Sequence, residues 1–261
     1  MVLKPLVKWS GGKTDELEKI IAHMPDTYDT YVEPFVGGGA LFFHLEPEKS
    51  IINDIHPELI SLYRQVQEGN GQRIYDTMKK HKNDEATYYQ VRDKFEPADD
   101  FDKAFKFYYL RKHCYRGMMR YNASGKFNIP FGRYKTINCE EIKDVRYENL
   151  LKKTKIFDKD FDYIFQNFNS SDNFCFIDQP YDSTFTNYGY CEFGRKEQER
   201  LAKSFKETNM KCLMIIGETD YIRTLYDGYI VDSYPKKYKF KLHSGRVGDG
   251  INNNHLVIKN Y

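Results

Sequence analysis

Four consecutive residues, Asp178-Gln179-Pro180-Tyr181, bring together a carboxylate, an amide, a rigid proline and an aromatic ring. They follow the apolar, aromatic-rich run at 174–177, which is typical of a buried central strand. Such a strand delivers polar groups to the carboxyl edge of a sheet, where α/β proteins bind their ligands. The combination suits a flat, amine-bearing heterocycle such as a nucleobase, because the carboxylate accepts hydrogen bonds and the ring can stack.

The chemistry that these four residues could perform is transfer of a methyl group to a ring amine. A nucleobase amine is a poor nucleophile, because its lone pair is delocalised into the ring. Hydrogen bonds from the amine to the Asp178 carboxylate and to the backbone carbonyl of Gln179 would localise that pair and aim it at an electrophilic methyl group. Tyr181 would stack on the extruded base and offset the cost of flipping it. The tetrapeptide alone is equally compatible with a simple Pro-Tyr turn.

A second set of residues is placed where a nucleotide-like cofactor would bind. Residues 33–39 (Glu-Pro-Phe-Val-Gly-Gly-Gly) form a predicted strand-to-helix turn whose glycines allow a ligand to approach the backbone closely. Asp54 ends the next predicted strand, 17 residues after Gly37, close to where an acid would bind a ribose diol. An adenosyl group with an amino-acid tail would fit this crevice, although the glycines by themselves are also compatible with a tight turn.

Residues 8–14 (Lys-Trp-Ser-Gly-Gly-Lys-Thr) end like a phosphate-binding loop. The complete pattern G-x-x-x-x-G-K-[ST] requires a glycine five residues before Gly12, and Val7 stands there instead. The sequence therefore disfavours a nucleoside triphosphatase. A turn into a helix from Asp15 is the alternative interpretation.

Positive charge is concentrated in one part of the chain. The formal net charge is only +2, yet residues 103–155 contain 14 lysines and arginines against 4 aspartates and glutamates. Aromatic residues are interleaved with these charges, which is typical of a surface that binds a polyanion with stackable bases. A solvated basic face with its aromatic residues in a local core is the alternative.

Composition excludes several other classes of protein. A hydrophobic content of 40% and a charged content of 30% fit a folded globular chain. No apolar run approaches the roughly 20 residues needed to cross a bilayer, and the first five residues do not resemble a signal peptide. The five cysteines form no C-x-x-C pair, so we expect neither a metal site nor a disulfide framework, and a reducing compartment is the simplest interpretation.

The predicted secondary structure places the candidate residues at one edge of a sheet. A strand, a glycine turn, a helix, a second strand and a second helix form a βαβ unit with a parallel sheet behind it. These elements are expected at 30–35, 40–45, 50–54 and from 57 onwards. Further strand patterns occur at 174–178, 211–216 and 255–258, with a helix around 195–206.

Between the two groups of strands, residues 56–154 have a helical and polar pattern, with one strand signal at 125–132. We therefore expect an α/β fold in which residues 1–55 and 155–261 form one catalytic domain. Residues 56–154 would be an inserted, basic, helical domain that recognises the polyanion.

Five segments, taken in order, resemble the Dam-type DNA adenine-N6 methyltransferases, which recognise GATC. They are Lys-Trp-x-Gly-Gly-Lys at 8–13, Glu-Pro-Phe-x-Gly-Gly-Gly at 33–39, Asn-Asp at 53–54, Arg-Tyr-Asn-x-x-Gly-x-Phe-Asn-x-Pro-Phe-Gly at 120–132, and the catalytic motif at 178–181. The resemblance covers most of the chain. It implies a Rossmann-like methyltransferase sheet with an inserted helical DNA-recognition domain, and it argues against methylation of RNA or of a protein glutamine.

The resemblance implies S-adenosylmethionine as the methyl donor and double-stranded DNA as the partner. The catalytic residues would be Asp178, Gln179, Pro180 and Tyr181. The cofactor pocket would be lined by Trp9, Lys13, Glu33, Phe35, Gly37, Asp54, Asp160, Phe161 and Asp178. A restriction endonuclease counterpart would be compatible with this function. The protein would be intracellular, in the cytoplasm or wherever its target DNA resides.

The same resemblance implies a set of DNA contacts. They are Lys8, Tyr115, Arg116, Met118, Arg120, Asn122, Pro130 and Tyr134. Tyr115 would wedge into the base stack, Met118 would touch a thymine methyl group, and Arg120 would bind guanine through two hydrogen bonds.

Gln179 departs from the family pattern, which has proline at this position. Glutamine keeps the backbone carbonyl, and Pro180 still biases residue 179 toward extended backbone, but Asp178 loses a constraint. We also expect the Gln179 amide to reach into the pocket and compete for Asp178. A misplacement of about 1 Å at a reacting centre can cost roughly 100-fold in rate. We therefore expect weakened methyl transfer, with a catalytically weak or silent DNA-binding relative as the alternative.

Overall fold

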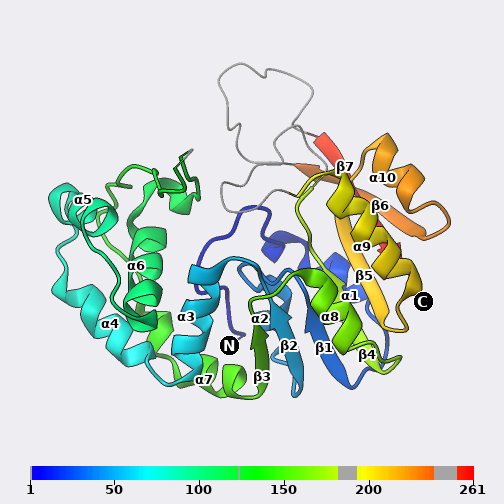
Figure 1. Cartoon of the computed structure of the whole chain (residues 1–261), viewed down its shortest axis with the longest axis horizontal. Helices are drawn as coiled ribbons and strands as arrows, with labels where there is room; N and C mark the ends of the chain where they lie inside the picture. The colour runs from blue at the N-terminus through cyan, green and yellow to red at the C-terminus, as the bar shows by residue number, and fades with distance from the viewer. Residues whose placement is uncertain (1, 123, 182–192, 238–251) are drawn as a thin grey trace.

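A computed structural model describes residues 2–122, 124–181, 193–237 and 252–261 (Figure 1). Its centre is a seven-stranded sheet with the order β3-β2-β1-β4-β5-β7-β6. The strands are β1 (Thr30–Glu33), β2 (Ser50–Asn53), β3 (Thr154–Phe157), β4 (Asn173–Ile177), β5 (Lys211–Gly217), β6 (Ile230–Lys237) and β7 (Asn252–Lys259). The first five run parallel, and β7 pairs antiparallel with both β5 and β6. The predicted α/β, Rossmann-like fold is confirmed.

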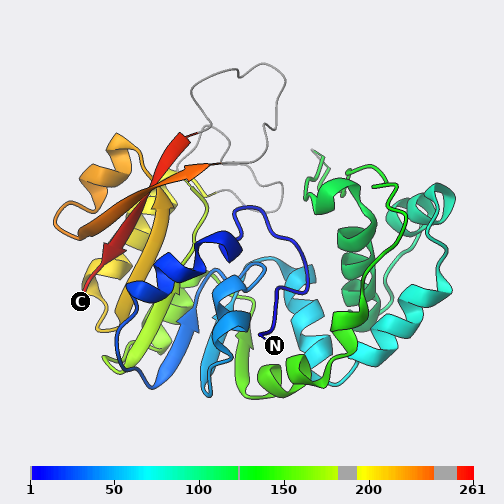
Figure 2. The ribbon, with the colours of Figure 1, turned by 180° about the vertical axis from the view of Figure 1, so that it is seen from behind.

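Helices cover both faces of the sheet because alternate strand residues point to opposite sides. In β4, Cys175 and Ile177 pack with helices α8 (Phe161–Asn167), α9 (Arg195–Glu207) and α10 (Asp220–Leu225). Phe174 and Phe176 pack on the other face, where α1 (Leu17–Ala22) and α2 (Ala40–Leu45) lie. Figure 2 shows this second face, with α1 and α2 in blue in front of the strands.

A largely helical segment lies between β2 and β3 in the chain. It contains α3 (Pro57–Gln67), α4 (Gly71–Lys80), α5 (Glu85–Asp93), α6 (Asp100–His113), the short 3₁₀ turns η2 (Tyr115–Gly117) and η3 (Glu140–Lys143), and α7 (Val145–Lys152). In Figures 1 and 2, α3 stands between the sheet and α6.

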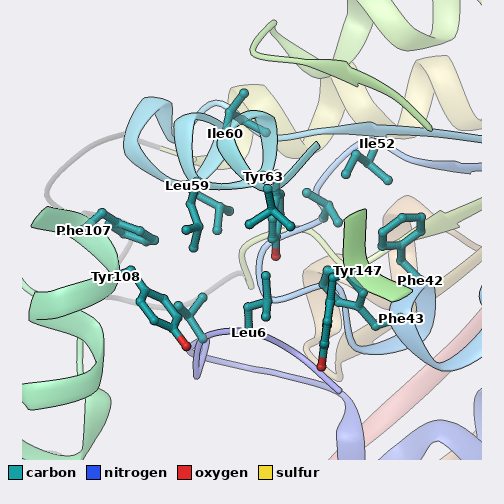
Figure 3. Close-up of a cluster of buried hydrophobic side chains, with 14 of the residues drawn as sticks. Leu6, Phe42, Phe43, Ile52, Leu59, Ile60, Tyr63, Phe107, Tyr108 and Tyr147 are labelled. Atoms are coloured by element: carbon teal, nitrogen blue, oxygen red, sulfur yellow. The ribbon is translucent and has the colours of Figure 1, made fainter. Parts of the chain in front are cut away.

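The helical segment and the sheet share one apolar core. Figure 3 shows side chains of α2, α3, α6 and α7 converging in a single cluster, with Phe42, Leu59, Tyr63, Tyr108 and Tyr147 among them. These five side chains are almost completely buried. The division into domains at residues 56 and 154 therefore stays a prediction, because the apolar packing is continuous across it.

The strand expected at 125–132 is wrong. This segment makes only the isolated bridges Tyr121↔Phe127 and Cys114↔Phe131. The Asn122 side-chain oxygen accepts hydrogen bonds from the backbone N–H groups of Ser124 and Lys126 at 3.0 and 2.9 Å, and these bonds hold a turn in place of a ladder.

Four of the five cysteines lie in the described residues, and each is buried and free; Cys191 lies outside them. Within those same ranges, no group of histidine, cysteine, aspartate and glutamate is arranged to hold a metal ion. Nor does this part of the chain contain a helix with the length and apolar character that a membrane span needs.

Candidate active site and DNA-facing segment

Asp178 and Lys13 form an ion pair at the carboxyl edge of the sheet. Asp178 directly follows β4, which lies beside β1 in parallel pairing, and Lys13 reaches it from the segment before η1 (Thr14–Glu16). The Lys13 side chain is only 1% exposed, and its Nζ also donates to the Gly11 carbonyl at 3.0 Å. Burial raises the pKa of Asp178, and the Lys13 ammonium opposes that rise. Lys13 therefore gives Asp178 a positional constraint that the sequence pattern alone did not reveal.

Gln179 points away from this pair. Its side chain is 2% exposed. Its Nε2 donates to Sδ of Met214, a buried residue of β5, at 3.2 Å. The expectation that the Gln179 amide competes for Asp178 is therefore wrong in this structure. Among the residues that the structure describes, none donates a hydrogen bond to the Gln179 backbone carbonyl. Within this part of the chain, no donor competes for the carbonyl that the proposed chemistry requires.

Tyr181 lies beside the same pair and is held by a buried acid–base cluster. Lys13 Nζ is 5.1 Å from the centre of the Tyr181 ring, and the ring meets His255 edge-on at 5.4 Å. His255 Nδ1 is 2.6 Å from Glu16, which also accepts a bond from Tyr234 Oη at 2.7 Å.

Glu16 and His255 are site residues that the sequence analysis missed. Burial raises the pKa of Glu16, but bonds from His255, Lys236 and Tyr234 outweigh it and lower the pKa to about 2. The available signal was His255, which is a polar residue at the start of an otherwise apolar strand pattern at 255–258.

The glycine turn after β1 is shaped by Trp9 and Asp54. Gly37 has a φ of +46°, and a Cβ there would lie 2.6 Å from the Trp9 indole, so only glycine fits. Asp54 Oδ2 accepts from the Gly37 N–H and Oδ1 accepts from the His56 N–H, both at 2.9 Å. Burial raises the pKa of Asp54 to about 6. Each carboxylate oxygen retains a further lone pair, so the ribose contact implied for Asp54 stays a prediction.

Glu33 lies close to both carboxylates. Burial, together with the charges of Asp178 and Asp54, holds the pKa of Glu33 well above its usual value, although Tyr31 Oη donates to it at 2.8 Å. The site therefore gathers the acidic side chains of Glu33, Asp54 and Asp178 near the ammonium of Lys13.

An aromatic pocket lies beside these acids. Phe35 and Phe161 face each other with ring centres 5.4 Å apart. The pocket is lined by Pro34, Phe35, Asn53, Ile55, Lys159, Asp160, Phe161, Phe193 and Glu197. Asn53 ties its two walls together by donating to the carbonyls of Pro34 and Lys159, both at 2.9 Å. Three of the predicted cofactor residues thus share one pocket, whereas Ile55 and Phe193 were not predicted.

The predicted DNA contacts Lys8, Tyr115 and Arg116 gather around η2. The Lys8 side chain packs on Gly117, because a Cβ on Gly117 would lie 3.0 Å from Lys8 Cδ. The Tyr115 ring is 44% exposed, and the Arg116 guanidinium lies 5.2 Å from its centre. Met118, directly after η2, is half-buried against the core.

The remaining predicted contacts lie on the turn at 120–134. Arg120 is exposed, and its Nε donates to Asn128 Oδ1 at 2.8 Å. The Asn122 amide oxygen is used within the turn, and the Pro130 carbonyl accepts from the Tyr115 N–H at 2.8 Å. Tyr134 packs against Gly132. The structure thus brings these residues onto one turn next to η2, and their DNA-binding roles stay predictions.

Comparison with known proteins finds DNA methyltransferases, both as a matching family and as individual relatives. The family model for D12 class N6 adenine-specific DNA methyltransferases matches residues 9–242. The type II methyltransferase M.CviBI of Paramecium bursaria Chlorella virus NC1A is 59% identical over 261 residues, covering 99% of this chain and 100% of that relative. The type II methyltransferase M.MjaIII of Methanocaldococcus jannaschii is 32% identical over the whole of both chains. The DNA adenine methylase of Haemophilus influenzae is 34% identical, covering 86% of this chain and 83% of its own length.

Proposed function

Because the chain belongs to the D12 class N6 adenine-specific DNA methyltransferases, we propose that it transfers a methyl group from S-adenosylmethionine to the N6 amine of a flipped adenine. The observation that carries this proposal is the pairing of Asp178 Oδ1 with buried Lys13, next to the Gln179 carbonyl, which accepts no hydrogen bond from the described residues. This arrangement leaves Asp178 Oδ2 and one backbone oxygen as two fixed acceptors for the two hydrogens of one amine.

The two acceptors would act by electrostatic preorganisation. As positive charge develops on N6 during transfer, a carboxylate and a carbonyl dipole already in place stabilise it without rearranging. Burial raises the pKa of Asp178, so its Oδ2 is a better acceptor for the proton that N6 must lose than an exposed aspartate would be. Tyr181, held between Lys13 and His255, would stack on the base.

The pocket chemistry supports S-adenosylmethionine as the cofactor, which supplies the electrophilic methyl group. Its sulfonium and ammonium groups are cationic, and Glu33, Asp54 and Asp178 gather next to the glycine turn. Its adenine would fit against Phe35 and Phe161, which line the adjacent pocket with Asp160. Lys13 and Trp9 would complete the wall on the side of the glycine turn.

The experiment that tests this proposal is incubation of the protein with labelled S-adenosylmethionine and a duplex library containing every short adenine-centred site. Label on adenine N6 is the expected result. No label on any duplex, under conditions in which a known adenine methylase is active, would contradict it. Transfer of label to DNA by the unaltered protein would also eliminate the catalytically silent alternative.

We propose GATC as the target, on the resemblance of the segment 115–120 and on the exposure of Tyr115 and Arg120. Arg120→Ala is expected to lower the preference for guanine at one position of the site by about 10- to 100-fold, because a bidentate Arg–guanine pair is worth about 1–3 kcal/mol. Sequencing of the methylated library measures this preference. Lys126→Ala, at an exposed position on the same turn, is the control and should weaken binding equally for all sequences.

Two results would count against the target. An Arg120→Ala protein with the parent's sequence preference would remove Arg120 from base recognition. A library methylated at another site would replace GATC and leave the adenine chemistry intact. The type II designation of two relatives supports a restriction endonuclease counterpart that cuts the same site.

Gln179→Pro tests whether the departure from the family pattern weakens catalysis. The Gln179 amide is directed to Met214, so the lost backbone constraint on Asp178 is the one remaining way in which glutamine could weaken catalysis. Lys13 already restrains the Asp178 side chain. We therefore expect kcat to rise, but by much less than the roughly 100-fold that a 1 Å misplacement can cost. Gln179→Leu keeps the buried bulk without fixing φ, and it should give no such gain. An equal gain from leucine would contradict the backbone explanation.

A further inference from the structure

A chain of hydrogen bonds joins the glycine turn of the cofactor pocket to the turn that carries the predicted DNA contacts. It begins at Asp54, whose Oδ1 accepts from the backbone N–H of His56 at 2.9 Å. His56 Nε2 lies 2.9 Å from Tyr121 Oη, and Tyr121 Oη donates to Glu58 Oε2 at 3.0 Å. The His56–Tyr121 contact joins residues 65 positions apart, which no local pattern links.

The proton positions in this chain can be assigned. His56 Nδ1 accepts from the backbone N–H of Leu59 at 3.3 Å, as the N-cap of α3. Burial lowers the pKa of His56 to about 3, so the ring is neutral and its proton is on Nε2. His56 therefore donates to Tyr121, and the Tyr121 hydroxyl is left to donate to Glu58.

The series of hydrogen bonds from Asp54 to Glu58 is flanked by packed aromatic rings on both sides. The His56 ring meets the Trp9 indole edge-on at 5.6 Å, and Trp9 in turn packs against Gly37. On the other side, Tyr121 pairs with Phe127 by an antiparallel bridge and a ring contact at 5.9 Å. Displacement of the 120–128 turn would therefore change the bond to His56, and through it the position of the glycine turn.

We propose that Tyr121 is a positioning residue that couples DNA binding to cofactor binding, so that each ligand strengthens the binding of the other. The inference rests on the proposed function. Arg120 and Asn122 flank Tyr121, and DNA bound to them would hold the turn in the arrangement that keeps the Tyr121 hydroxyl on His56. The cofactor would favour the same arrangement through Asp54 and Gly37. Two ligands that prefer one arrangement of a shared element bind cooperatively and by the same factor in either order.

The coupling can be measured in both directions. Trp9 is the single tryptophan and lies against Gly37 and His56, so its fluorescence reports on the cofactor pocket. The Kd of S-adenosylhomocysteine, which has no methyl group to transfer, is measured with and without a duplex that the protein methylates. The Kd of that duplex is then measured by fluorescence anisotropy with and without S-adenosylhomocysteine. We expect each ligand to tighten the other by the same factor, about 5-fold or more.

Tyr121→Phe should reduce this factor to near 1 in both directions while single-ligand binding persists. Tyr109→Phe is the matched control, because Tyr109 is buried in α6 and its hydroxyl has no hydrogen-bond partner in the described part of the chain. It should keep the parent's factor. Glu58→Gln should keep part of the coupling, since an amide oxygen still accepts from Tyr121. Glu58→Ala, which leaves the ring in place, replaces Tyr121→Phe if that variant does not fold.

The results of these binding experiments distinguish failure of the coupling from failure of the proposed function. A Tyr121→Phe or Glu58→Ala protein with the parent's coupling factor would overturn the inference, as would a parent protein that binds both ligands independently. In both cases methylation of the library would leave the proposed function standing. A parent that binds neither ligand and methylates no duplex would overturn both together.

Discussion

Replacing Asp178 with asparagine is expected to lower the single-turnover rate of methyl transfer about 100- to 1,000-fold, the usual effect of removing one preorganised polar group from a reacting centre. Asparagine has nearly the same shape, so the backbone and Tyr181 should stay in place. Its oxygen is neutral, however, and neither stabilises the charge that develops on N6 nor accepts the proton that N6 loses. Rapid-quench assays with labelled S-adenosylmethionine at saturating DNA measure this rate without interference from product release.

The control for Asp178→Asn is the same substitution at the opposite end of β4. Asp172 is exposed and directly precedes the strand, so Asp172→Asn should keep the parent rate. Trp9 fluorescence should show a change in cofactor affinity for Asp178→Asn that is much smaller than the change in rate. A variant that keeps about a tenth of the parent rate or more would show that the carboxylate charge contributes little, since tenfold is only about 1.4 kcal/mol.

Lys13→Met is expected to shift the pH dependence of methyl transfer and to destabilise the protein. Burial raises the pKa of Asp178, and the Lys13 ammonium is the main opposing effect, so its removal should raise that pKa further. In the proposed mechanism transfer needs the ionised carboxylate, so the rate should be lost as pH falls through this pKa. The acid limb of the pH–rate profile should therefore move to higher pH in the variant. Single-turnover rates measured across the pH range test this shift.

Lys13→Met should lose stability as pH rises, whereas its rate of methyl transfer should be lost as pH falls. An aspartate whose pKa is raised by folding contributes stability below its unfolded pKa, and that contribution is lost as pH rises through the folded pKa. The variant should therefore lose more free energy of unfolding near about pH 8 than near about pH 5, approaching about 3 kcal/mol for a buried carboxylate left unpaired. Adding Asp178→Asn removes the unpaired charge and should restore most of this loss. A double variant no more stable than Lys13→Met would contradict the pairing.

The strands that carry the site could be predicted because they are buried on both faces. All five residues of β4 and all four of β2 are buried, so both appear in the sequence as short apolar runs that end in polar residues. The edge strands β3 and β6 were missed. β3 has a single fully buried residue, and β6 contains Pro235 and two lysines, features that edge strands tolerate and central strands do not.

The orientation of Gln179 could have been predicted by extending the alternation of β4 by two residues. Cys175 and Ile177 face the same core layer as Met214, and Gln179 continues that series, whereas Asp178 falls on the other side. Long-range pairings could not be predicted in this way. Lys13 and Asp178 are 165 residues apart, and the sequence gives no spacing rule that selects one lysine for one carboxylate.

The place of β7 in the sheet bears on how the enzyme matures during synthesis. β7 comes last among the described strands, yet it lies between β5 and β6, and β6 pairs with no other of these strands. While the chain emerges from the ribosome, the parallel strands can pair in turn, but β6 has no neighbour until residues 252–259 are available. The same late strand delivers His255, which packs against Tyr181. A nascent chain can thus form its helical segment early, but the Tyr181 ring receives its support from His255 only after residues 252–259 have been synthesised.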